Sequence, residues 1–184
     1  MGSWLRSSLS PAAYNHVVYG KGAWVFHMLR MMLRDPAAKD PDARFAAFLR
    51  GLLEEFRHKP LTNLALQRAV EKVMTPAMDL EGSRSMEWFF DQWVSNTGIP
   101  RYKVEFDVRQ RGERFLVRGK LKQAGVLETF TAPVPLYAPR AGAKPLLLGT
   151  VVTTGAETPF EFTLSFRPRR LLIDPNNTLL CVVE

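Results

Sequence analysis

The sequence predicts an α+β protein in two segregated domains: a helical bundle over residues 1–99, followed by an antiparallel β-sandwich over residues 100–184. Apolar residues recur every three to four positions before residue 100 and every second position after it, the periods of helices and strands. The charge balance changes at the same place, with 12 basic and 10 acidic residues up to residue 100 and 13 and 8 beyond it. At 46% hydrophobic and 23% charged residues, the 184-residue chain can form a folded core, which excludes a disordered tail.

The first two helices are predicted from proline and aspartate positions. A helix over residues 17–33 ends before Pro36, because proline excludes the helical conformation from the residue before it. A second helix begins at Asp40 and Pro41, where the carboxylate caps free N–H groups and proline lacks a donor that would go unused. Its expected apolar face consists of Phe45, Phe48, Leu49, Leu52, Leu53 and Phe56.

Two further helices follow from capping residues. Thr62 is expected to cap the third helix, and either Ser83 or Ser85 the fourth, which ends at Gly98. Their apolar faces consist of Leu66, Ala69, Val70 and Val73 in the third helix and Met86, Phe89, Phe90 and Trp93 in the fourth.

The first helix is apolar on almost every side, and such a helix is expected to be buried all round. Either it lies centrally between the bundle and the sandwich, or the chain is the end of a larger protein whose missing part covers it. In the second case the isolated chain would self-associate through the exposed face of this helix.

About seven short strands are expected after residue 100, because β-branched and aromatic runs alternate with Gly, Pro and Asn punctuation. The runs cover residues 102–109, 115–122, 129–135, 146–153, 160–166 and 179–183. Turns are expected at Arg111 and Gly112 and over residues 174–177.

The cysteine count and the length of the apolar runs exclude several classes of protein. The single cysteine, Cys181, excludes an internal disulfide and a cysteine-rich zinc site, and its apolar strand indicates a small core residue. No apolar run is long enough to span a bilayer and no secretory signal is visible, so we expect a soluble chain with no membrane partner.

Three stretches carry a family resemblance. Residues 14–23 read YNHVVYGKGA, residues 86–93 read MEWFFDQW before a Gly-Ile-Pro at 98–100, and residues 170–175 read RLLIDP. In this order they resemble segments of the aminopeptidase N family of gluzincin zinc metallopeptidases: the segment after the zinc site, the last catalytic-domain helix, and the closing strands of the next domain. The resemblance implies that residues 1–99 are the helical C-terminal part of the catalytic domain and that residues 100–184 form an immunoglobulin-like sandwich.

The resemblance also implies two site residues. Tyr19 matches the family tyrosine whose phenol donates a hydrogen bond to the oxyanion formed when zinc-activated water attacks the peptide carbonyl. A phenol suits this role because it is a neutral donor with a pKa near 10. Tyr14 matches a second tyrosine with a supporting role, for which a packing role is equally compatible. Without the resemblance, Tyr19 would be interpreted as an aromatic anchor at a helix start, and Gly20 stands where the family commonly has Glu.

The zinc ligands of that family, an H-E-x-x-H motif on a helix and a downstream Glu, are not found in this sequence. The three histidines, His16, His27 and His58, are separated by 11 and 31 residues, so no two of them lie on adjacent turns of one helix. We therefore expect zinc in a full-length parent and none in this chain. The expected partners are the missing N-terminal catalytic region and, in the parent, a peptide substrate.

The function expected from these features is that of a C-terminal fragment of a zinc-dependent aminopeptidase, inactive alone, which contributes Tyr19 and structural support. The alternative is a non-catalytic interaction or scaffold module descended from the same family. A third hypothesis is nucleic-acid binding by the basic residues of the second domain. These alternate along strands without a recognition motif, which favours a solvated outer face and no nucleic-acid partner. They are Arg101, Lys103, Arg109, Arg111, Arg114, Arg118, Lys120 and Lys122.

Overall fold

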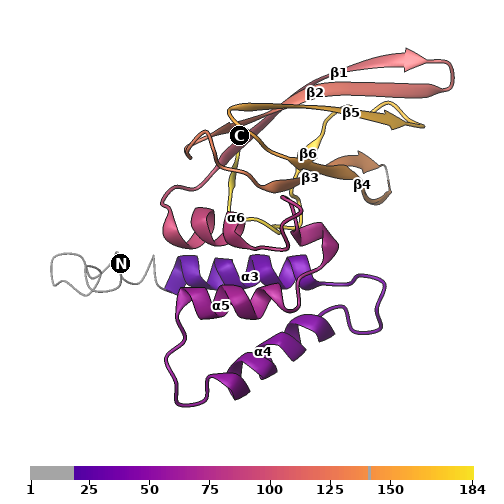
Figure 1. Cartoon of the computed structure of the whole chain (residues 1–184). Helices are drawn as coiled ribbons and strands as arrows, with labels where there is room; N and C mark the ends of the chain where they lie inside the picture. Colours follow the sequence, from indigo (N-terminus) through magenta and orange to yellow (C-terminus); the bar gives the residue numbers. More distant parts are fainter. Residues whose placement is uncertain (1–18, 141) are drawn as a thin grey trace. The chain divides into compact units, whose positions relative to one another are not determined.

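The computed structural model describes residues 19–140 and 142–184, and the chain divides between Asn96 and Thr97 into two compact units. The first unit contains α3 (Gly22–Leu33), α4 (Ala43–Glu55), α5 (Asn63–Glu71), the 3-10 turn η2 (Pro76–Met78), α6 (Glu87–Phe90) and the π-helical turn η3 (Asp91–Ser95) (Figure 1). The second unit contains β1 (Arg101–Arg111), β2 (Arg114–Ala124), β3 (Pro133–Arg140), β4 (Ala143–Val152), β5 (Glu157–Leu164), β6 (Leu172–Ile173) and β7 (Val182–Val183).

Helix α3 ends where the sequence predicts. Its last residue is Leu33, and Arg34 already has an extended backbone with ψ 135° ahead of Pro36. Within the described residues this helix is not buried on all sides, because Ala23 is exposed and most residues off one stripe are only half-buried. The buried stripe consists of Val25, Met28, Leu29 and Leu33.

Helix α4 begins later than the predicted Asp40. The Asp40 carboxylate accepts the N–H of Asp42 at 3.1 Å and holds this segment in a turn, so the helix starts at Ala43. Asp42 accepts a two-pronged hydrogen bond from the guanidinium of Arg30 on α3, with its Oδ1 3.1 Å from Nε. Leu53, expected on the apolar face, is 73% exposed.

Helices α5 and α6 are joined by one carboxylate. Thr62 caps α5 as predicted, accepting the N–H of Ala65 at 3.1 Å. Glu71 at the end of α5 accepts the Ser85 hydroxyl at 3.1 Å and the Met86 N–H at 2.9 Å. Of the two expected caps, Ser85 is the one whose oxygen accepts a helical N–H, that of Glu87.

The predicted helical bundle was wrong. The last helix has four residues, and its continuation to Ser95 is a π-helical turn that ends before Gly98. The first unit is a set of short helices joined by turns around a small core, because Pro76 and Gly82 interrupt the chain between α5 and α6. The fully buried members of this core include Met28, Leu29, Leu33, Val70, Met86 and Phe89.

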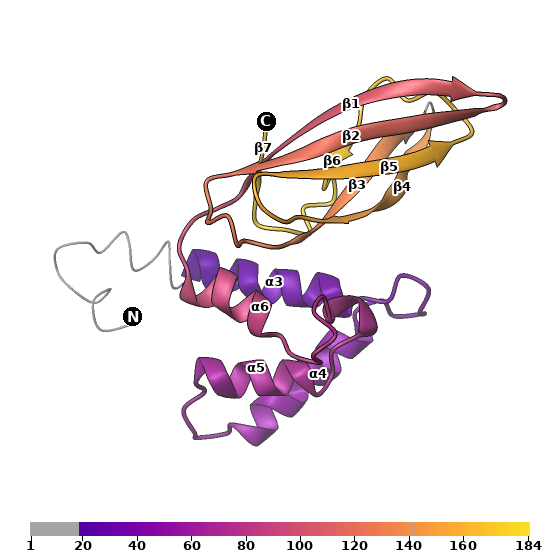
Figure 2. The ribbon, with the colours of Figure 1, turned by 45° about the horizontal axis from the view of Figure 1, so that its top comes forward.

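The strands form two small sheets, one with the order β5-β2-β1-β7 and one with the order β4-β3-β6 (Figure 2). Strands β1 and β2 form a long antiparallel hairpin that turns at Gly112, as predicted, with Arg111 opposite Arg114. Gly112 has φ +61°, a conformation that glycine adopts without steric cost.

The predicted antiparallel immunoglobulin-like β-sandwich was also wrong. Strand β7 runs parallel to β1, pairing Arg101 with Val182, so the larger sheet is mixed. Strands β6 and β7 have only two residues each. The alternation of side chains shows which residues share a face of a strand, but it does not specify the partner strand or its direction. The chain is an α+β protein with short helices and two small sheets.

A buried polar network lies in the second unit. Gln123 is 7% exposed and accepts the Tyr102 hydroxyl at 3.2 Å and the Thr153 hydroxyl at 2.8 Å. Its amide donates to the carbonyls of Phe130 and Gly155. Among the described residues, no buried side-chain nitrogen or oxygen lacks a hydrogen-bond partner. No helix in the described part of the chain is long and apolar enough to cross a membrane.

Candidate functional site

Tyr19 lies in the turn that leads into α3. Residues 19–21 form a π-helical turn, and the α-helix begins at Gly22. A π-helical turn widens the backbone locally and is frequent at functional sites. Tyr19 is 65% exposed.

The turn that carries Tyr19 is tied to the end of η3. The Lys21 ammonium donates to the backbone oxygen of Asn96 at 2.6 Å, across 75 residues of sequence. Burial lowers the pKa of Lys21, because its charged form loses water. Trp93, 1% exposed, anchors η3 in the core, so the start of α3 is held against a packed element.

Tyr14, the second candidate, lies outside the described residues, as does His16. Of the two tyrosines, the structure therefore describes Tyr19 alone. The sequence did not predict the hydrogen bond from Lys21 to the backbone oxygen of Asn96. Every residue has such an oxygen, so no side-chain pattern identifies the acceptor.

The described residues do not fit a zinc site. Within them, no group of three or more His, Cys, Asp or Glu side chains is placed to hold a metal ion. His27 on α3 is half-buried and packs edge-on against Trp24, with ring centroids 5.3 Å apart. His58 is exposed in the loop after α4, at φ +59°.

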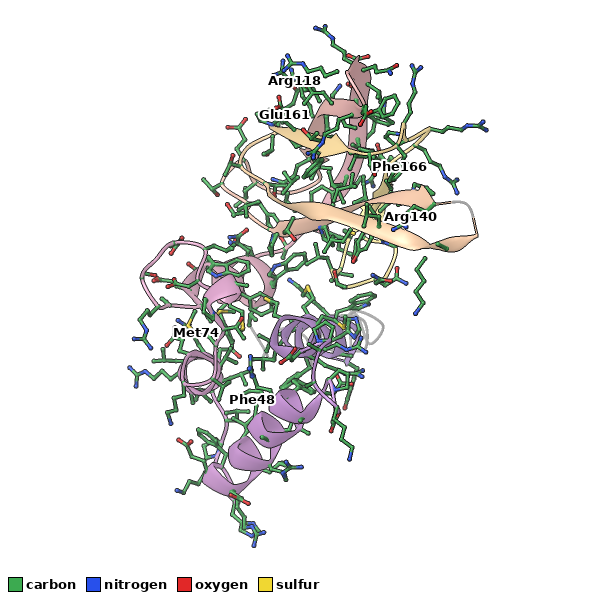
Figure 3. All side chains as sticks on the ribbon, turned by 90° about the vertical axis from the view of Figure 1, so that its right-hand side faces the viewer. Phe48, Met74, Arg118, Arg140, Glu161 and Phe166 are labelled. Carbon is green, nitrogen blue, oxygen red and sulfur yellow. The ribbon has the colours of Figure 1, made fainter. Side chains whose placement is uncertain are left out.

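Most of the basic residues on β1 and β2 have acidic neighbours. Lys122 lies 2.8 Å from Glu105, and Lys120 lies 2.8 Å from Glu157. Lys122 hydrogen-bonds Glu105 and lowers the pKa of that carboxyl. Arg118 pairs with Glu161 (Figure 3). The paired side chains lie in solvent, where each ion pair contributes little to stability.

Cys181 is half-buried, in the segment that leads into β7. Burial, followed by the negative charge of Asp174, raises the pKa of its thiol to about 11. A thiol with so high a pKa is a poor nucleophile at neutral pH, which fits a packing role.

The fold of this chain is similar to part of a solved aminopeptidase structure. The solved structure of Legionella pneumophila aminopeptidase A, in complex with aspartic acid, is similar to this chain with a TM-score of 0.66 and 15% sequence identity. The match covers 94% of this chain and 18% of that protein. No protein-family model matches the chain. No curated protein matches it either. At this identity the likeness shows an aminopeptidase-like fold.

Proposed function

We propose that this chain supplies the last helices of a catalytic region, and the β unit that follows, to an aminopeptidase that hydrolyses peptides at the amino terminus. The observation that carries the proposal is the fold likeness to an aminopeptidase along 94% of the chain. Since the chain spans 18% of that enzyme, the proposal assigns the other catalytic groups to segments outside the described residues.

Tyr19 is the side chain we assign to chemistry. In peptide hydrolysis, negative charge develops on the carbonyl oxygen, and a neutral hydrogen-bond donor stabilises it. Two features support Tyr19 as this donor: its 65% exposure and its place on a turn that Lys21 ties to η3. The Lys21 bond restrains the backbone of the turn that carries this donor, and a restrained backbone lowers the reorganisation needed when the charge appears.

In this proposal, zinc is bound by residues outside the described part of the chain. The described residues offer no ligand cluster, so no catalytic step is assigned to a metal bound by them. The residues that this chain contributes are a hydrogen-bond donor and the helices that hold it.

The test is Tyr19→Phe in the protein encoded by the complete reading frame, assayed with aminoacyl chromogenic substrates. Losing one oxyanion donor costs about 10²–10³ in kcat, or about 2.7–4 kcal/mol, with KM nearly unchanged. Tyr137→Phe is the matched control, because it removes a phenol that accepts from Asn176 at 2.9 Å in the second unit, and it should keep full activity.

Two outcomes contradict the proposal. If Tyr19→Phe retains the kcat and kcat/KM of the wild type, Tyr19 is a packing residue at a helix start. If the complete protein hydrolyses no aminoacyl substrate even with zinc added, the non-catalytic interaction module is the better description.

A further inference from the structure

Four arginines surround a hollow of about 900 Å³ in the second unit, well away in sequence from Tyr19. Its lining consists of Pro139, Arg140, Phe166, Arg167, Pro168, Arg169 and Arg170, here called the arginine pocket. Arg140 ends β3, and the other residues belong to the segment between β5 and β6; Figure 3 shows Arg140 and Phe166 at the same end of the unit. The volume is in the range of small-molecule sites.

The positive charge of the arginine pocket is uncompensated. No carboxylate lines it, and none of the ion pairs within residues 19–140 and 142–184 involves its four arginines. Guanidinium groups remain charged at all physiological pH values, so four residues that line one hollow are positively charged. The hollow beside Arg118 and Glu161 differs, because its lysines and carboxylates pair with one another.

The backbone beneath these arginines is constrained. Buried Leu164 and Leu171, each 7% exposed, anchor the two ends of the segment. Pro168 is buried between Arg167 and Arg169 and fixes its own φ, which limits the conformations available to its neighbours. Phe166 and Pro139 are half-buried and provide an apolar wall.

We propose that the arginine pocket binds a soluble ligand that carries a di- or triphosphate group. A single carboxylate can pair with one guanidinium and would leave the other three facing one another. Each phosphate group carries about one to two negative charges at pH 7 and several acceptor oxygens, so two or three linked phosphates match four arginines. The planar guanidinium binds phosphate oxygens in pairs, and the apolar wall offers contact to the group attached to the phosphates.

Isothermal titration of the 184-residue chain with sodium tripolyphosphate tests this, at about 0.15 M salt so that distant surface charges are screened. We expect one site per chain. Citrate, a polycarboxylate, should bind at least about tenfold more weakly, because it carries fewer negative charges and fewer acceptor oxygens than tripolyphosphate. A parallel titration with ATP distinguishes a nucleotide from free polyphosphate: tighter binding of ATP assigns the apolar wall to a nucleoside, and equal binding assigns the site to the phosphates alone.

The double variant Arg140→Ala with Arg170→Ala removes one guanidinium from each side of the hollow and should weaken tripolyphosphate binding about tenfold or more. The control is Arg111→Ala with Arg114→Ala, which removes the same charge from exposed positions at the β1–β2 hairpin and should change affinity less than about twofold. Circular dichroism should show both variants folded, since all four side chains are exposed. Absence of tripolyphosphate binding, equal weakening by both variants, or equal affinity for citrate would each overturn the proposal.

Discussion

Replacing Asp174 by alanine should selectively destabilise the second unit. Asp174 is 4% exposed, and its Oδ1 accepts both the N–H of Thr178 at 2.9 Å and its hydroxyl at 2.7 Å. Its Oδ2 accepts the N–H of Leu179 at 2.8 Å, a residue that is itself 7% exposed. The residue also has φ +41°, which Asp and Asn tolerate better than Ala. The side chain and the backbone therefore both depend on this residue type.

The expected loss is the sum of three effects. The N–H of Leu179 is left buried without its acceptor, at a cost of about 1–3 kcal/mol. The bonds to Thr178 contribute about 1 kcal/mol, since water can replace part of them at a half-buried residue. The positive φ costs alanine about 1 kcal/mol. Asp174→Ala should thus lower the free energy of unfolding by about 3–5 kcal/mol, and Asp174→Asn by about 1–2 kcal/mol because it keeps one acceptor and the backbone preference.

The two units can be followed separately in a urea titration. All four tryptophans precede residue 97, so their fluorescence reports on the first unit, whereas far-UV circular dichroism reports on both. We expect the dichroism transition of the second unit to move to lower urea in the order wild type, Asp174→Asn, Asp174→Ala. A loss below about 1 kcal/mol for Asp174→Ala, or equal losses for the two variants, would refute the assignment of the carboxylate as the organiser of this turn.

Three further predictions concern one buried and two half-buried side chains. Gln123→Leu should lower the free energy of unfolding by about 2–4 kcal/mol, because four hydrogen bonds of a buried amide are lost; an unchanged urea midpoint would show that the network is replaceable. For Glu71, burial raises the pKa, but hydrogen bonds from Gln67, Met86 and Ser85 outweigh it and bring the pKa below the usual 4.5. The ionised Glu71 therefore stabilises the fold at pH values above its pKa in the unfolded chain, and this stabilisation is lost as the pH falls through its lower pKa in the folded chain. Glu71→Gln should make the free energy of unfolding depend less on pH in the acid range. An unchanged slope of stability against pH would contradict this. Cys181, with its pKa raised to about 11, should react with iodoacetamide at pH 8 at least about tenfold more slowly than a free thiol of pKa about 8.5, because its smaller thiolate fraction outweighs the greater nucleophilicity of that thiolate. Alkylation at the free-thiol rate would mean that the thiol is not half-buried as described.

Local signals in the sequence were sufficient for several elements. Pro36 stops α3, Thr62 caps α5, and Gly112 turns the β1–β2 hairpin, as expected. In each case the deciding interaction lies within a few residues, so chain neighbours carry the information. The start of α4 was missed because the side chain of Asp40 binds the N–H of Asp42 in a turn instead of capping a helix.

The catalytic role of Tyr19 stays a prediction. The residue type and position of Tyr19 came from a resemblance in sequence, and its exposure came from the structure. The arginine pocket could not be anticipated, although three of its arginines lie within residues 167–170. Arg140 lies 27 residues before Arg167, and only the folded sheet brings the two to one hollow.

The amino-acid pattern was enough to show that helices come first and strands follow, and that an H-E-x-x-H zinc motif is not in this chain, because these depend on periodicity and residue order. It was not enough for the parallel pairing of β7 with β1, for the interruption of the last helix by a π-helical turn, or for the bond from Lys21 to the carbonyl of Asn96. Each of these joins segments far apart in the chain or depends on backbone groups that every residue shares. Such groups are identical along the sequence, so tertiary packing decides which of them meet.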